Sequence, residues 1–204
     1  MNREIRSYVL RQGRTTPSQQ KALDELFPRF GIAFAEKNLN FKETFSRAAP
    51  VILEIGSGMG ETTAEIAQAN PQIDYVAVEV HGPGVGGLLK KIDALGLKNL
   101  RLIRHDAVAV LEHMIPDGSL AGLHLFFPDP WPKKRHHKRR LVQPPFAALA
   151  ARKLAPGAYV HAATDWPEYA EQIEAVLTSE PMLEKADQSR TRPVTKFERR
   201  KKMY

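Results

Sequence analysis

The sequence predicts an α/β fold, in which a mostly parallel, doubly wound sheet carries helices on both of its faces. Two patterns give this prediction. Short apolar runs alternate along the chain with segments of helical periodicity, and the connections between them are short. The chain of 204 residues, of which 43% are hydrophobic, has enough apolar surface for one core. We therefore expect a single domain over residues 1–204.

Composition limits the chemistry that this chain can perform. It contains no cysteine, so disulfides and thiolate metal sites are excluded, and we expect no metal ion. The sequence shows no secretory h-region and no apolar run long enough to span a bilayer. We expect a cytoplasmic protein without a membrane partner.

The basic residues are concentrated in three segments of the chain. Residues 1–21 hold five basic and one acidic side chain, residues 133–140 hold six and none, and residues 190–204 hold seven and one. The remainder holds 12 basic and 21 acidic residues, so the body of the protein is acidic. We expect residues 1–17 to form a flexible basic arm and residues 190–204 a basic C-terminal segment. This concentration of basic residues in three segments favours a polyanionic partner.

The first strongly apolar run is followed by a glycine turn and a helical segment. Glu54 lies within this predicted strand, Gly56, Gly58 and Gly60 follow it, and the helix begins near Glu61. A strand, a glycine turn and a helix N-terminus together form a common cofactor site. The spacing is GxGxG and differs from the GxGxxG dinucleotide fingerprint. Glycines also occur in any tight turn, so this signal alone is weak.

Acidic residues follow the next two predicted strands. Residues 73–80 form the second strand and contain Glu79 near its end, where a carboxylate can accept hydrogen bonds from ribose hydroxyls. Residues 99–104 form the third strand and lead to Asp106, which is equally typical of a helix N-cap. One side chain can fill both roles. Between them, the predicted helix 83–96 has three glycines near its start, which indicates close packing there.

The fourth predicted strand, residues 120–127, delivers Asp129 into a proline-rich loop with Trp131. The basic run 133–140 follows at once and favours RNA contact, although a charge run is also typical of a solvated surface. Trp131 suits either stacking on a base or simple packing of the loop.

The remaining predicted elements complete the alternation. They are helices near 18–26, 146–154 and 167–177, a fifth strand at 158–163 followed by Asp165, and a last strand near 194–197. Because the carboxyl ends of parallel strands share one edge of the sheet, Glu79, Asp106, Asp129 and Asp165 should gather there.

Several motifs resemble those of the bacterial tRNA (guanine-N7-)-methyltransferases, an S-adenosylmethionine-dependent family with a Rossmann-like, seven-stranded sheet. They include EIGSGMG, EVHGPGVGGLL, FPDPWPKKRHHKRR, TDW and TKFE. The resemblance implies methyl transfer from S-adenosyl-L-methionine to N7 of a guanine in the variable loop of tRNA. It implies that Asp129 is the catalytic residue. The cofactor would be bound by Glu54, Gly56, Gly58, Gly60, Glu79, Asp106 and Asp129.

The same resemblance assigns residues to the RNA side. It implies that the substrate is bound by Lys133, Asp165, Thr195, Lys196, Phe197 and Glu198. It implies further RNA contacts by Arg135, His136, His137, Lys138, Arg139 and Arg140. Ser57 departs from the family pattern, where Phe is more usual, and the N-terminal extension is short. The sequence leaves open whether the protein is a monomer or a homodimer.

The chemistry of guanine N7 suits a site without a general base, because N7 carries a lone pair and no proton. The Asp129 carboxylate could accept hydrogen bonds from N1–H and N2–H of the base. Two alternatives remain. One is an exocyclic-amine methyltransferase of the adenine N6 type, because Asp129-Pro130-Trp131 resembles the turn of that class without its second proline. The other is a non-catalytic RNA-binding protein on a methyltransferase fold.

Overall fold

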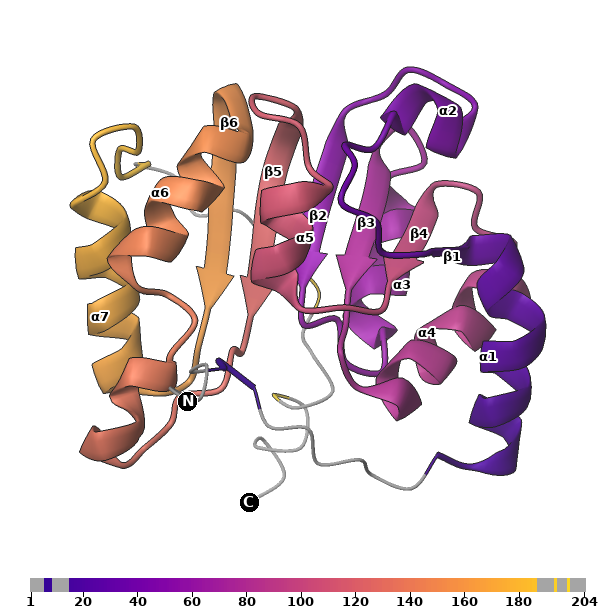
Figure 1. Cartoon of the computed structure of the whole chain (residues 1–204), viewed down its shortest axis with the longest axis horizontal. Coiled ribbons are helices and arrows are strands. Elements are labelled where there is room, and N and C mark those ends of the chain that lie inside the picture. Colours follow the sequence, from indigo (N-terminus) through magenta and orange to yellow (C-terminus); the bar gives the residue numbers. More distant parts are fainter. Residues whose placement is uncertain (1–5, 9–14, 187–192, 194–197, 199–204) are drawn as a thin grey trace.

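The computed structural model describes residues 6–8, 15–186, 193 and 198. Within them, six strands form one sheet in the order β1-β4-β3-β2-β5-β6 (Figure 1). Every neighbouring pair is parallel. The strands are β1 Gly31–Ile32, β2 Val51–Ile55, β3 Asp74–Val78, β4 Leu100–Ile103, β5 Leu120–Phe126 and β6 Leu154–Ala163.

Helices cover both faces of the sheet, which confirms the doubly wound arrangement (Figure 1). One face carries α1 Pro17–Phe30, α3 Glu61–Ala69 and α4 Gly82–Ala94. The other carries α2 Phe41–Phe45, α5 Ala107–His113, α6 Pro144–Lys153 and α7 Pro167–Thr178. None of the described helices is both long and apolar enough to cross a bilayer.

Two hydrophobic clusters arise because successive side chains of a strand point to opposite faces. Leu53 and Val76 pack into the cluster under α5, α6 and α7, whereas Ile52 and Tyr75 pack into the cluster under α1, α3 and α4. All five residues of β2 and all five of β3 are buried. The central strands therefore form a rigid support for the loops at their ends.

The sheet differs from the sequence-based prediction in its strands. The described residues contain six strands rather than seven, and they include β1, which the sequence did not reveal because it is only two residues long. The predicted strand at 194–197 lies outside the described residues. β6 begins at Leu154 rather than at 158, with a register shift against β5 between Leu120 and Gly122. α1 reaches Phe30 and contains Pro28.

The glycines at the start of α4 allow close packing, as predicted. A Cβ atom on Gly84 would lie 2.6 Å from the carbonyl oxygen of Gly58, and one on Gly86 would lie 2.8 Å from the carbonyl oxygen of Gln19. Backbone therefore meets backbone between α4, the glycine turn and α1. This contact fixes the turn that follows β2.

Candidate active site

A cleft of about 350 Å³ opens at the carboxyl ends of the central strands. Its lining includes Glu79, Asp106 and Asp129, which follow β3, β4 and β5. Gly56 and Tyr8 also line it. The topology thus brings together three of the acids that the sequence predicted at this edge of the sheet.

Glu79 connects the glycine turn to the start of α4. Its Oε2 accepts a hydrogen bond from the Gly58 N–H at 2.7 Å, and its Oε1 accepts from the His81 N–H at 2.8 Å. The side chain is 8% exposed. Two backbone donors therefore hold this carboxylate in one orientation at the edge of the cleft.

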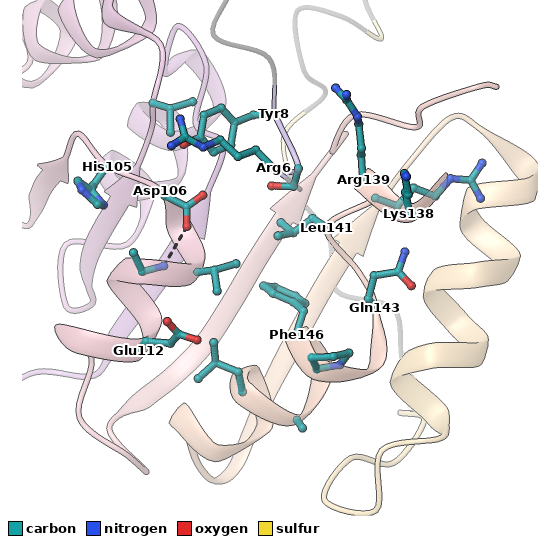
Figure 2. Close-up of a pocket in the computed structure, with 18 of the residues that line it drawn as sticks. Arg6, Tyr8, His105, Asp106, Glu112, Lys138, Arg139, Leu141, Gln143 and Phe146 are labelled. Carbon is teal, nitrogen blue, oxygen red and sulfur yellow. Dashed lines mark hydrogen bonds between the residues drawn. The ribbon is translucent and has the colours of Figure 1, made fainter. Parts of the chain in front are cut away.

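Asp106 combines the two roles that its sequence position allows. Its Oδ1 accepts from the Ala109 N–H at 2.9 Å and caps α5, as Figure 2 shows. It also lines the cleft. The cap fixes the direction of the carboxylate, because the helix start determines where the side chain must lie.

The three glycines of the turn serve different purposes. All three have positive φ angles, namely 77° at Gly56, 54° at Gly58 and 75° at Gly60. A Cβ atom on Gly56 or Gly58 would meet nothing within 4 Å, whereas one on Gly60 would lie 2.7 Å from Cβ of Leu88. Gly56 and Gly58 thus border open space that a ligand can enter, and Gly60 packs against α4.

Glu54 lies beneath the glycine turn and is not among the lining residues of the cleft. It is 3% exposed, and its Oε1 accepts from the Thr63 hydroxyl at 2.8 Å. Oε2 is buried and has no hydrogen-bond partner in the described part of the chain. Burial raises the pKa of Glu54 to about 7, the Thr63 hydrogen bond opposes this rise, and the nearby Glu79 adds to it.

The loop that carries Asp129 has a constrained backbone. Phe127 and Trp131 adopt positive φ angles of 52° and 46°, which side chains other than glycine rarely do. Asp129 is exposed as a residue, but partial burial of its carboxyl group raises the pKa above its ordinary value. The indole N–H of Trp131 donates to the carbonyl oxygen of Ser7 at 3.0 Å, and the guanidinium carbon of Arg139 lies 4.9 Å from the indole centroid.

The hydrogen bond between Trp131 and Ser7 links two distant parts of the chain. In this structure the indole packs within the protein and joins the N-terminal segment to the loop after β5. The side chains of Ser7 and Tyr8 also line the cleft, a role that the sequence did not reveal. The sequence around them, residues 1–17, indicated only a basic arm because of its arginines.

The basic run after Pro132 forms a 3₁₀ helix, η1 Lys134–Arg139. Lys133, Lys134, Arg135 and Lys138 are exposed, while His136, His137 and Arg139 are partly buried. Arg140 differs, because it is 3% exposed. Its guanidinium donates to the Pro130 carbonyl at 2.8 Å and to Oε1 of Gln172 at 2.7 Å, and it lies 3.6 Å from Glu168.

The residues assigned to the substrate lie in different places. Lys133 and Asp165 are exposed at the same edge of the sheet but do not line the cleft. Glu198 is described as partly buried. Thr195, Lys196 and Phe197 lie outside the described residues.

Comparison with known proteins identifies the family. A family model described as "Putative methyltransferase" matches residues 48–203. A tRNA (guanine-N(7)-)-methyltransferase of Methylobacillus flagellatus is 57% identical over 204 residues, which cover 97% of this chain and 86% of the relative. A protein of the same name from Nitrosospira multiformis is 55% identical and covers 98% of this chain and 89% of its own length. The chain belongs to the tRNA (guanine-N(7)-)-methyltransferase family.

Solved structures confirm the class of fold. The precorrin-6y C5,15-methyltransferase of Geobacter metallireducens superposes with a TM-score of 0.53 at 12% identity, over 84% of this chain and 73% of that one. An antibiotic-related methyltransferase superposes with a TM-score of 0.51 at 16% identity, over 70% of this chain and 76% of that one. Membership of the family makes this chain a methyltransferase with a Rossmann-like sheet. It favours the N7 enzyme over both alternatives that the sequence had left open.

Proposed function

We propose that this chain transfers a methyl group from S-adenosyl-L-methionine to N7 of a guanine in the variable loop of tRNA. The observation that carries the proposal is the meeting of Glu79, Asp106 and Asp129 in one cleft beside Gly56. Its relatives at 55 to 57% identity are named for this activity. A tRNA substrate also implies that the protein works in the cytoplasm.

The residues of the cleft fit the cofactor. When bound, S-adenosylmethionine would supply an activated methyl group on its sulfonium sulfur, and the neutral thioether would be the leaving group as the carbon–sulfur bond breaks and N7 takes the methyl. The open space beside Gly56 and Gly58 admits a ligand close to the backbone. Carboxylates of Glu79 and Asp106 suit a ligand with hydroxyl and amino donors and net positive charge. A volume of about 350 Å³ is within the range of small-molecule sites.

Among the proposed cofactor residues, the geometry supports two roles, which are contact with the ligand and support of the turn. Glu79 would accept from ribose hydroxyls, in the orientation that the Gly58 and His81 N–H groups impose. Glu54 would support the turn from below, because its carboxylate holds Thr63 of α3. Gly60 would do the same through its close packing with Leu88.

Asp129 would orient the guanine rather than remove a proton. Its carboxylate can accept from N1–H and N2–H of the base, which holds N7 in line with the methyl group. A negative charge beside the base also stabilises the positive charge that the purine gains. No proton leaves N7, so no general base is needed.

The tRNA would meet the exposed cations of the loop after β5. Lys133, Lys134, Arg135 and Lys138 are exposed and suited to phosphate contacts. Arg140, whose guanidinium is buried among Pro130, Gln172 and Glu168, would shape this loop instead. We also assign substrate contact to Asp165, to residues 195–198, and to the basic segments 1–17 and 190–204.

The test is methyl transfer from radiolabelled cofactor to a tRNA transcript, followed by nucleoside analysis. The proposal predicts labelled 7-methylguanosine, and none when the target guanine is replaced by 7-deazaguanosine. Binding of the deaza transcript should remain nearly unchanged. A label on an exocyclic amine would favour the adenine N6 type of enzyme, and binding without transfer would favour a non-catalytic RNA-binding protein.

A solvent isotope effect tests the role of Asp129 in the same reaction. Single-turnover transfer measured in H₂O and in D₂O should proceed at nearly equal rates, because no proton moves in the chemical step. A large difference between the two rates would contradict the N7 mechanism.

A further inference from the structure

A second cavity, of about 860 Å³, lies between α5 and α6 (Figure 2). It is continuous with the cleft, because both are lined by Ser7, Tyr8, Val80, His105, Asp106 and Leu141. We call it the α5–α6 groove. A molecule that reaches Asp129 in the cleft can therefore extend into the groove.

The groove is strongly basic, unlike the cleft. Among the described residues that line it, six are cationic and two are acidic. The acids are Asp106 and Glu112, and the cations are Arg6, Arg104, Lys138, Arg139, Arg140 and Arg152. The cofactor carries a sulfonium and an ammonium group, so this field disfavours it and favours an anion.

Two of these cations come from a part of the chain that is otherwise acidic. Arg104 follows β4, and Arg152 lies in the last turn of α6. Neither belongs to the three basic segments, outside which the chain holds 12 basic and 21 acidic residues. The fold therefore brings two positive side chains to this groove from a part of the chain whose net charge is negative.

Both arginines have side chains that a ligand can reach. Arg104 is exposed. Arg152 is also exposed, and its Nε lies 3.5 Å from Asp117, which Lys153 binds more closely at 2.6 Å. Because Lys153 keeps Asp117 paired, Arg152 is not needed to neutralise that carboxylate.

Apolar residues also line the groove between its cations. They include Val108 and Ala109 of α5 and Pro145 and Leu149 of α6. A chain of alternating phosphates and planar bases matches such a surface, because phosphates bind the cations and bases cover the apolar wall. A polyanion without apolar groups would leave this wall exposed to water.

We propose that the α5–α6 groove binds the strand of the tRNA that adjoins the target guanine, with its phosphates on Arg104 and Arg152. This inference rests on the proposed function, since it takes the base at Asp129 to be part of a tRNA. It extends the RNA site from the basic loop to the α/β body, namely to the segment after β4 and to α6.

The first experiment replaces both arginines in the full-length protein, as Arg104→Gln with Arg152→Gln. The affinity for a tRNA transcript is measured over a range of salt concentrations. Each lost phosphate contact lowers the slope of log affinity against log salt by ~0.7 to 0.9, so the pair should lower it by about 1.4 to 1.8. Cofactor affinity, measured by calorimetry without RNA, should not change.

The matched control is Lys42→Gln with Lys98→Gln. Both lysines are exposed and lie near the amino ends of β2 and β4, away from the groove. The control loses the same net charge, so a general effect of charge would appear in it equally. The proposal predicts that its salt slope equals that of the wild type.

The second experiment locates the contact on the RNA. Phosphates on either side of the target guanine are replaced one at a time by uncharged methylphosphonates. At one or more of these phosphates, the replacement should lower the affinity of the wild type for the tRNA. The same replacement should not change the affinity of the double variant, because that variant already lacks the arginine that contacts the phosphate.

The outcomes separate the groove from the proposed function. If the wild type forms 7-methylguanosine but the double variant keeps the wild-type slope, the groove is not an RNA site and the function stands. If the variant loses cofactor affinity with an unchanged slope, the groove belongs to the cofactor and the inference fails. If the wild type forms no 7-methylguanosine, the proposed function fails, whatever the slope.

Discussion

The two sides of the active site are built by different forces. On the proposed cofactor side, the segments after β2 and β3 are held by backbone contacts such as that of Gly84 with Gly58, and by the hydrogen bonds of Glu79. On the proposed RNA side, cations follow β5 and line the α5–α6 groove, and most of them are exposed. We expect steric fit to govern the first side, so that a methyl group placed against its backbone disturbs it. We expect charge to govern the second side, so that salt weakens RNA binding and single substitutions there cost little stability.

Asp129 lies where the two sides meet, and its removal should have the largest effect. We expect Asp129→Ala to lower kcat by ~10²-fold to 10³-fold, as when one contact to a charge-developing transition state is lost. Single-turnover methyl transfer measures this, and cofactor calorimetry should show binding near that of the wild type. Equal loss of cofactor binding and turnover would place Asp129 on the cofactor side alone.

We expect turnover to depend on pH because Asp129 is partly desolvated at the edge of the cleft. Burial raises its pKa, so its carboxylate becomes protonated, and loses an acceptor, at a higher pH than an ordinary aspartate. Single-turnover rates should fall as the pH decreases through that raised pKa.

Glu54 allows a test of the cofactor side through stability. Its pKa rises from 4.5 to about 7 in the folded protein, which therefore holds an extra proton between these values. The free energy of unfolding should fall as the pH rises through this window. The Glu54→Gln variant has no charge to bury, so its free energy of unfolding should not fall in this window. The difference in stability between the variant and the wild type should therefore grow by on the order of 3 kcal/mol from pH 4.5 to above 7.

Urea denaturation at several pH values measures this difference. Glu36→Gln is the control, because Glu36 is exposed, and its curve should run parallel to that of the wild type. If the curve of unfolding free energy against pH for Glu54→Gln also ran parallel to that of the wild type, burial would not raise the pKa of Glu54.

Two alanine substitutions in α4 test whether backbone packing decides the cofactor side. The Cβ of Gly84→Ala would lie 2.6 Å from the Gly58 carbonyl oxygen, which cannot move without distorting the turn. That of Gly87→Ala would lie 2.6 Å from Cε of Met59, the end of a flexible side chain. We expect Gly84→Ala to cost roughly 2 kcal/mol of stability and to weaken cofactor binding.

Gly87→Ala should change stability by less than about 1 kcal/mol, because helix propensity offsets the movement of Met59. Thermal unfolding and cofactor titration of both variants give the comparison. Similar behaviour of the two variants would show that the clash with Gly58 is relieved elsewhere.

The smallest expected effects separate two arginines of the basic loop. Arg140→Gln removes the buried hydrogen bonds to Pro130 and Gln172, so we expect a loss of about 1.5 kcal/mol of stability and an unchanged salt slope of tRNA binding. Arg135→Gln alters an exposed side chain, so stability should stay within ~0.5 kcal/mol while the slope falls by ~0.7 to 0.9. A lower slope for Arg140→Gln would show that its guanidinium reaches the RNA.

The sequence by itself determined where the acids gather. Glu79, Asp106 and Asp129 follow three parallel strands, and the carboxyl ends of such strands share one edge, so their meeting follows from the alternation of elements. It also predicted the close approach at the start of α4, because glycines early in a helix are costly unless another segment packs there.

Only the tertiary structure decided which of these residues reach the cleft and which support it. Arg140 looks like its neighbours in the basic run, and its burial depends on Gln172, which is 32 residues away. Glu54 lies under the turn because its strand is covered by α3, and the α5–α6 groove joins Arg104 and Arg152 from separate elements. Local patterns specify helices, strands and charge, whereas burial and pairing arise from contacts between distant segments, which no local pattern records.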